Sequence, residues 1–181
     1  MALGEDGGPQ GRPAEPGREV AGSPPPPGHH VTAILDEAGV GYELLPHAHT
    51  ETAADEAEAL GVPPGEVAKT LVVTTPSGHV RAVVPASERL DLGKLRDVLA
   101  EGGRHKVHLV AEEDLGRDYG DFELGAVPPF GGPGDDVVVD RRVAARESVV
   151  VEAGTHDQSL RLAAADLVRI TGAQVADICQ D

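Results

Sequence analysis

Apolar residues recur at helical spacing along several stretches of the chain. In the first stretch they stand at positions i, i+3, i+4 and i+7, and the four residues are Val31, Ile34, Leu35 and Ala38. This spacing places them on one face of a helix, and the glycine that follows them is a common helix end. Comparable patterns predict helices over residues 52–60, 92–99, 111–115 and 164–170.

Short runs of β-branched and other apolar residues lie between these helices. They predict strands over residues 42–45, 69–74, 79–84, 106–110, 137–139, 149–151 and 159–162. Ser77 and Gly78 separate the second and third runs, and this pair favours a tight hairpin turn. Because strands and helices are interspersed and a hairpin joins neighbouring strands, the pattern predicts an α+β fold with a mixed sheet.

Residues 1–28 differ from the rest of the chain, because they hold many Gly and Pro residues and almost no apolar pattern. Such a segment buries too little surface to offset the entropy lost on ordering, so we expect a disordered tail. Residues 29–181 are then expected to form one domain. Apolar residues make up 40% of the chain but aromatic residues only 2%, so its core must consist mainly of Ala, Val, Leu and Ile.

The chain is strongly acidic, with 15 Lys and Arg residues against 31 Asp and Glu residues and a formal net charge of −16. The expected tail holds four acidic and two basic residues, so the rest of the chain still carries −14. Proteins that bind nucleic acid over an extended surface usually present a basic one. The acidity therefore argues against such a surface, but it permits a narrow pocket that accepts one end of an RNA.

The chain has a single cysteine, Cys179, so no intrachain disulfide can form. The first residues lack the basic segment and apolar run of a secretory signal, and no run approaches the roughly 18 apolar residues of a membrane helix. These features predict a cytoplasmic protein with no membrane partner.

Several motifs, taken together in their order and spacing, resemble the YbaK-type family of prolyl-tRNA-synthetase-associated domains. The resemblance runs from about residue 29 to the C-terminus. Its parts are the helix Thr52–Leu60 with Gly61-Val62, the segment Glu66–Leu71, the loop Gly125-x-x-Pro128-Pro129-Phe130-Gly131, the strand end Val138-Val139-Asp140, and Gly154-Thr155-His156 followed by Ser159-Leu160 and Asp166-Leu167.

The resemblance implies a mixed, mainly antiparallel sheet surrounded by helices. It also implies a hydrolase that removes a wrong amino acid from the acceptor end of aminoacyl-tRNA. The chain is too short for a synthetase body, so it would act in trans as a monomer or weak dimer without a cofactor, with a tRNA synthetase as a second candidate partner. Members of the family remove different amino acids, among them alanine, cysteine and serine. The Pro-Pro-Phe-Gly loop departs from branches with a smaller residue before a proline, which leaves the subfamily open.

Lys69 matches the position of the central lysine in that family. An aminoacyl ester is already labile, so its hydrolysis needs an oriented water and a stabilised oxyanion rather than a strong nucleophile. The expected role of Lys69 is to hold a phosphate or the polar backbone of the substrate as a compact charge. From spacing alone, a solvated lysine at a strand end is the alternative.

The Gly/Pro-rich loop is the second candidate element. Its glycines allow close backbone approach, so it is expected to supply an oxyanion site or the wall of the amino-acid pocket. An ordinary surface loop is the alternative. Phe130 could stack on the terminal adenine or anchor the loop in the core. The substrate-binding candidates in this loop are Gly125, Val127, Pro128, Pro129, Phe130 and Gly131.

The remaining candidates are polar residues and a glycine near the expected pocket: His49, Thr50, Asp140, Gly154, Thr155, His156 and Ser159. His156 could also serve as a base, because histidine titrates near neutrality. His47-x-His49 raises the alternative of a metal site, but zinc catalysis needs about three protein ligands and no such motif appears, so no metal is expected. A non-catalytic binding module and a metal-dependent hydrolase stand as the rival functions.

Overall fold

The computed structural model describes residues 29–100 and 107–181. The expected tail, residues 1–28, and residues 101–106 lie outside the described residues. The helices are α1 (His29–Glu37), α2 (Ala53–Leu60), η1 (Pro64–Glu66), α3 (Leu92–Val98), α4 (Glu112–Asp118), α5 (Arg141–Ala144) and α6 (Ala164–Thr171). The strands are β1 (Tyr42–Pro46), β2 (Val67–Thr75), β3 (Gly78–Pro85), β4 (His108–Leu109), β5 (Asp136–Asp140), β6 (Ser148–Thr155), β7 (Gln158–Ala163) and β8 (Gln174–Ala176).

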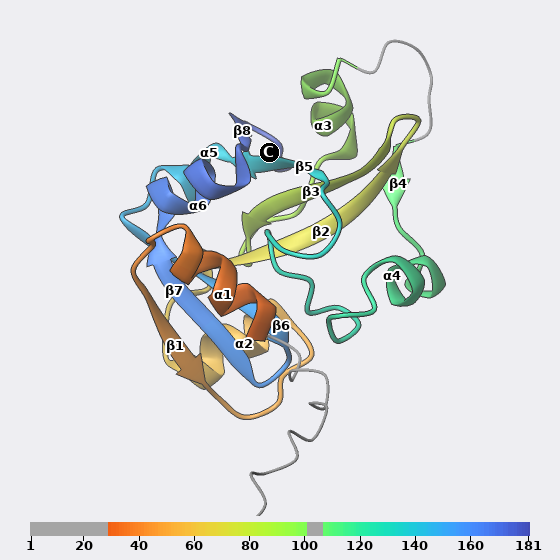
Figure 1. Ribbon diagram of the computed structural model, residues 1–181. Helices are drawn as coiled ribbons and strands as arrows, with labels where there is room; N and C mark the ends of the chain where they lie inside the picture. The colour runs from red at the N-terminus through yellow and green to blue at the C-terminus, as the bar shows by residue number, and fades with distance from the viewer. Residues whose placement is uncertain (1–28, 101–106) are drawn as a thin grey trace, which may run out of the picture.

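The strands form one sheet in the order β1-β7-β6-β2-β3-β5-β8, and β4 pairs with β2 outside this path (Figure 1). The β1–β7, β6–β7, β2–β3 and β2–β4 pairs are antiparallel. The β2–β6, β3–β5 and β5–β8 pairs are parallel. The predicted α+β fold with a mixed, mainly antiparallel sheet is confirmed.

Helices cover both faces of the sheet, because β2 and its neighbours present apolar side chains alternately to each side. Ala68 and Val72 enter the large core beneath α1 and α6, whereas Val73 packs beneath α3. A smaller cluster joins Ala57 of α2 to Val67 of β2. Figure 1 shows α1 in front of the sheet and α2 behind it.

The neighbour of β2 changes along its length on the edge away from β3. Residues 67–68 pair with residues 150–151 of β6, and residues 73–74 pair with residues 108–109 of β4. Among the described strands, none pairs with residues 69–72 on that edge. The sheet therefore splits between β6 and β4, and the split leaves room beside the middle of β2.

The structure confirms the two helices predicted near residues 31–38 and 52–60, and shows how neighbouring residues begin and end them. Gly39 and Gly61 adopt left-handed conformations after α1 and α2, with φ of 67° and 66°. Thr52 caps α2, because its Oγ1 accepts a 3.1 Å hydrogen bond from the Asp55 N–H and donates to the Asp55 carboxylate at 2.7 Å. No helix in the described part of the chain is long and apolar enough to cross a membrane.

Two expectations need correction. Residue 106 of the strand predicted over residues 106–110 lies outside the described residues, and within 107–110 the strand is only His108–Leu109, because the chain meets β2 for two residues before α4 begins. The short elements α5, β8 and η1 were not predicted. Four residues are too few to show helical periodicity, and Asp140, which caps α5, carries the one local signal for it.

Candidate functional site

A cavity of about 280 Å³ lies where β2 and β6 separate. The N-terminal end of α2 contributes Ala53 and Ala54, the two residues before it line the cavity as well, and the two strands and the Gly125 loop supply most of the remaining wall. The lining residues are Glu51, Thr52, Ala53, Ala54, Lys69, Thr70, Leu71, Ala86, Gly125 and Glu152.

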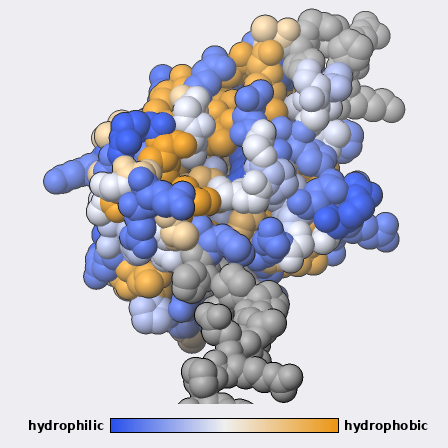
Figure 2. Space-filling view, viewed as in Figure 1, coloured by the Kyte–Doolittle hydropathy of each residue, from blue (hydrophilic) through white to orange (hydrophobic). Residues whose placement is uncertain are grey.

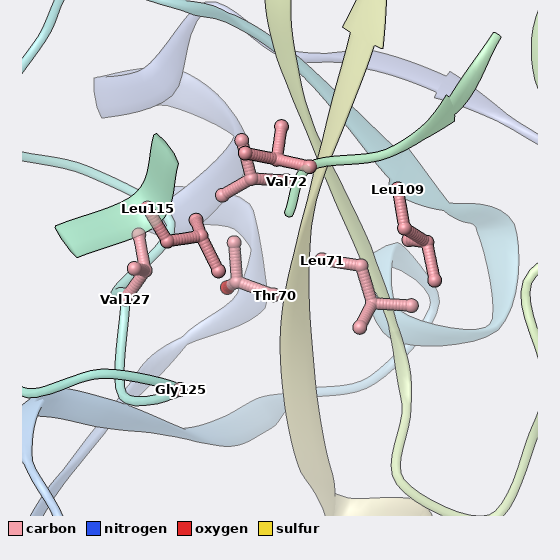
Figure 3. Close-up of a pocket in the computed structure, with 8 residues that line it drawn as sticks. Thr70, Leu71, Val72, Leu109, Leu115, Gly125 and Val127 are labelled. Carbon is pink, nitrogen blue, oxygen red and sulfur yellow. The ribbon is translucent and has the colours of Figure 1, made fainter. Parts of the chain in front are cut away.

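A second, mainly apolar pocket of about 200 Å³ adjoins the first, because both are lined by Thr70, Leu71 and Gly125. Figure 3 shows Thr70 pointing from β2 toward Leu115 and Val127, and Leu71 on the other side of the strand near Leu109. A polar cavity thus opens beside an apolar one along the same strand.

Lys69 is partly buried in the wall of the polar cavity. Burial lowers the pKa of its ammonium below the ordinary value. Lys94, by contrast, forms ion pairs with Asp177 and Asp181, whereas among the described residues no carboxylate pairs with Lys69. An unpaired ammonium at a cavity wall is able to bind a negatively charged or strongly polar group.

Glu152 of β6 lines the same cavity and was missed by sequence reasoning. Burial, together with the charges of Glu56 and Glu123, raises the pKa of Glu152 to about 8. The carboxyl group is therefore mostly neutral at pH 7. The signal that could have found it is a single carboxylate within the apolar run of a fully buried strand, Val149–Ala153.

His156 lies in the turn between β6 and β7, beside Glu152. Its Nε2 is 2.7 Å from the Leu124 carbonyl oxygen, which only accepts, so Nε2 carries the proton and Nδ1 is a bare acceptor in the neutral ring. Nδ1 is buried, lies 4.0 Å from Glu152 Oε1 and has no hydrogen-bond partner among the described residues. The His156 N–H donates to Glu123 at 2.7 Å.

Ser159 joins two titratable side chains in a buried network. Its Oγ donates to the Glu56 carboxylate and lies 2.8 Å from His47 Nε2. A hydroxyl has one proton, so His47 Nε2 must donate to Ser159. His47 Nδ1 lies 2.7 Å from the Ala48 carbonyl oxygen. The Ser159 hydroxyl therefore links Glu56 of α2 to His47 at the end of β1.

Glu56 is the buried end of this network, with 1% of its surface exposed. Burial raises its pKa, against the opposing effects of the Ser159 hydrogen bond and the charges of His47 and His156. The Ser159 hydroxyl gives Oε1 of this buried carboxyl group a hydrogen-bond donor, which offsets part of the cost of burying it. Sequence reasoning missed Glu56 as well, because α2 there looks like an ordinary acidic helix.

The other predicted residues of this region surround the His156 turn. The Thr50 N–H donates to the His156 carbonyl at 3.0 Å, and the His49 ring lies 5.2 Å from the His156 ring. Thr155 Oγ1 donates to Asp157 at 2.7 Å, and the Gly154 carbonyl accepts from the Glu123 N–H at 2.9 Å. The structure thus brings these residues together beside the cavity rather than on its lining.

The Gly/Pro-rich loop divides into two parts. Gly125, with φ of 85°, and Val127 line the pockets. The residues after them are inward-facing: Pro128 and Pro129 are buried, and Phe130 is only 6% exposed and belongs to the core. In this structure Phe130 is therefore a loop anchor.

Arg81 of β3 holds that loop in place through hydrogen bonds to its backbone. Its guanidinium donates to the carbonyl oxygens of Pro128 and Pro133 at 2.9 Å each, and also to that of Gly131. Nε forms a 2.9 Å ion pair with Asp135. The guanidinium is 2% exposed, so this buried charge is satisfied entirely within the protein.

Asp140 has a structural position at the end of β5. It is fully buried, and its carboxylate accepts from the Arg142 N–H at 2.8 Å and the Ile178 N–H at 2.9 Å. It lines neither of the two pockets beside Lys69. Its contacts thus cap α5 and fasten the C-terminal segment.

His47 and His49 meet different partners, namely Ser159 and the His156 ring. In the two described segments, no group of three or more His, Cys, Asp or Glu side chains is arranged to hold a metal ion.

Comparison with known proteins gives a family match. Residues 47–170 match the model of the aminoacyl-tRNA editing domain. The chain is 30% identical over 149 residues to EbsC of Enterococcus faecalis, a candidate Cys-tRNA(Pro)/Cys-tRNA(Cys) deacylase, with 80% of this chain and 89% of that protein covered. It is also 30% identical over 111 residues to a proline–tRNA ligase of Fervidobacterium nodosum, with 61% of this chain but only 19% of the ligase covered.

Solved structures show the same fold. A candidate trans-editing enzyme for prolyl tRNA synthetase superimposes with a TM-score of 0.77 and 28% identity, over 88% of this chain and all of that one. The crystal structure of a hypothetical protein gives a TM-score of 0.76 and 29% identity, over 84% of this chain and all of that one.

Proposed function

The chain belongs to the aminoacyl-tRNA editing domain family, and we propose that it acts in trans as a deacylase that hydrolyses the ester of misacylated tRNA. The family match covers residues 47–170, which include the whole cavity lining. The match to nearly the full length of a candidate deacylase supports action in trans, although the chain spans only about a fifth of the related proline–tRNA ligase.

The observation that carries this proposal is the unpaired, partly buried Lys69 ammonium in a cavity between separating strands. A charge in such surroundings interacts more strongly than it would in water. Lys69 is proposed to hold the polar backbone or terminal phosphate of the acceptor end, and so to fix the ester relative to the cavity walls.

The oxyanion of the tetrahedral intermediate is proposed to form beside Gly125. This residue presents backbone rather than a side chain to the cavity, and its positive φ turns the loop at that point. The first residues of α2 line the same cavity, and the N-terminal end of a helix favours negative charge. Together with Lys69 these groups would stabilise the developing oxyanion.

The reaction then needs only a positioned water. Its oxygen bonds to the ester carbonyl carbon, the carbonyl electrons move to the oxyanion, and collapse breaks the bond to the ribose oxygen. The ribose oxygen takes up the proton that the water loses, so the products are the free amino acid and the uncharged tRNA. A narrow cavity admits the acceptor end alone, which is compatible with the net charge of −16.

The acidity of the chain favours one rival, a non-catalytic module that binds a small ligand or a protein. The discriminating experiment is hydrolysis of a panel of tRNAs charged with different amino acids, in the presence of EDTA. Selective loss of one or two esters supports the deacylase. No hydrolysis with or without divalent metal would favour the binding module, and hydrolysis only with metal would favour a metal-dependent enzyme.

A further inference from the structure

Two buried side-chain atoms in the described residues lack any hydrogen-bond partner: Glu56 Oε2 and His156 Nδ1. Such atoms are rare in native proteins, since burying a polar group without a partner is costly. His156 Nδ1 is an acceptor, because the proton of the neutral ring lies on Nε2. Glu56 Oε2 is an acceptor as well, because the carboxylate accepts from the Ser159 hydroxyl through Oε1 and Oε2 carries no proton of its own.

Both atoms belong to groups that interact with Glu152. His156 Nδ1 lies 4.0 Å from Glu152 Oε1, and the charge of Glu56 acts on both Glu152 and His156. Of these three groups, Glu152 lines the cavity, whereas Glu56 and His156 stand beside it, so Glu152 is the acceptor that a ligand in the cavity meets first. The group that would complete them is a donor, and the surrounding carboxyl groups favour a positively charged one.

The distance between His156 Nδ1 and Glu152 Oε1 fits one nitrogen bound to both atoms. An N–H···O or N–H···N contact is about 2.9 Å long, and one tetrahedral nitrogen at that distance from each of two acceptors holds them roughly 4 to 5 Å apart. The 4.0 Å between His156 Nδ1 and Glu152 Oε1 lies in this range. Glu152 lines the cavity, so such a nitrogen would be presented to it from the cavity itself.

We propose that Glu152, with His156 Nδ1 beside it, binds the α-ammonium of the esterified amino acid and so selects substrates whose amine is free. This inference rests on the proposed deacylase function, because it names the part of the same substrate that the second wall recognises. Lys69 then faces the polar or anionic portion of the substrate, and Glu152 its cationic portion. An ester whose amine is acylated, as in peptidyl-tRNA, would leave Glu152 without its partner.

The protonation of Glu152 agrees with this assignment. Glu152 is faced by Glu56 from α2, Glu123 from the loop before Gly125, His156 from the β6–β7 turn and Lys69 across the cavity. Without substrate, Glu152 holds a proton, which avoids a further buried negative charge. An ammonium would take the place of that proton, so binding is expected to release a proton to the solvent.

The test compares two stable analogues of the acceptor end, adenosine carrying an amide-linked alanyl group or an amide-linked lactyl group at the 3′ position. The two differ only in having an ammonium or a hydroxyl at the α-carbon, and alanine has the smallest chiral side chain. Calorimetry on the full chain is expected to show binding of the alanyl analogue about ten- to a hundredfold tighter than that of the lactyl analogue.

Glu152→Gln keeps the size and neutrality of the protonated carboxyl, so the variant should fold, and it should bring that ratio close to one. Glu58→Gln, on the exposed side of α2, is the matched control and should leave the ratio unchanged. An unchanged ratio in a folded Glu152→Gln protein, or no preference in the wild type, overturns the inference. Because the analogues cannot be hydrolysed, a preference for the ammonium without hydrolysis of charged tRNA would refute the deacylase alone.

Discussion

Lys69 and Glu152 are the first residues beyond the last paired rung of β2 and β6, and they line one cavity from its two walls. The parallel pairing ends at Ala68 and Val151, after which the strands separate. A basic and an acidic side chain therefore stand on either side of the opening. Figure 2, in the orientation of Figure 1, shows hydrophobic patches between hydrophilic residues on the outer surface.

Replacing the cavity lysine should separate activity from stability. Lys69→Ala is expected to lower kcat/KM for deacylation by about a hundredfold or more, because the variant loses the charge that holds the substrate. Its thermal midpoint should change by less than about 2 °C, since a partly desolvated ammonium without an ion pair adds little stability. Lys94→Ala is the control, and it should keep full activity because Lys94 binds only the C-terminal segment. Full activity in Lys69→Ala would remove Lys69 from the mechanism.

The pH dependence of stability should report on Glu152. Its pKa is raised from 4.5 to about 8 in the folded protein, so the folded state keeps a proton that the unfolded chain releases. The group therefore lowers the free energy of unfolding as pH rises from about 4.5 to about 8. Glu152→Gln removes this titration. We expect similar melting temperatures at low pH and a variant more stable by about 5 °C or more at pH 8.5. Parallel melting curves across this range would contradict the raised pKa.

Alanine substitutions at two glycines should separate the effect of backbone strain on stability from its effect on activity at the cavity. Gly125 and Gly61 both have positive φ, and an alanine at either should cost about 1–2 kcal/mol of stability. Only Gly125→Ala should slow deacylation, by about tenfold or more, because its strain shifts the backbone at the cavity. Chemical denaturation and steady-state hydrolysis measure the two effects. Equal activity in both variants would place the oxyanion site elsewhere.

The buried guanidinium beneath the Pro-rich loop should be needed for stability. Arg81→Met leaves three carbonyl oxygens without their donor and Asp135 without its ion pair, so we expect a loss of about 3–5 kcal/mol. Arg117 is 68% exposed and pairs with Asp114 and Asp118 at the surface, and Arg117→Met should cost less than about 1 kcal/mol. Urea unfolding of the two variants makes the comparison. A small cost for Arg81→Met would mean that the loop is held by Phe130 and its neighbours alone.

Features that depend on neighbouring residues could be predicted from the sequence. The spacing of apolar residues predicted α1 and a helix over residues 52–60, and the resemblance to a known family identified the segment that contains Lys69. These signals work because helix periodicity, capping and turn formation involve residues within a few positions of one another. The length of β4 was overestimated, since the extent of a strand depends on where its partner runs.

Glu152 and Glu56 could not be found in this way, although both bear on the chemistry of the cavity. Glu152 looks like an irregular position in an apolar strand, and Glu56 like one of several acids on α2. Their burial, their effect on one another and the unpartnered Nδ1 of His156 arise only when α2, β6 and the β6–β7 turn meet. The amino-acid order by itself determined which face of each element is apolar, whereas the separation of β2 from β6 decided which charges share a cavity, because electrostatic interaction and desolvation depend on distance in space and not along the chain.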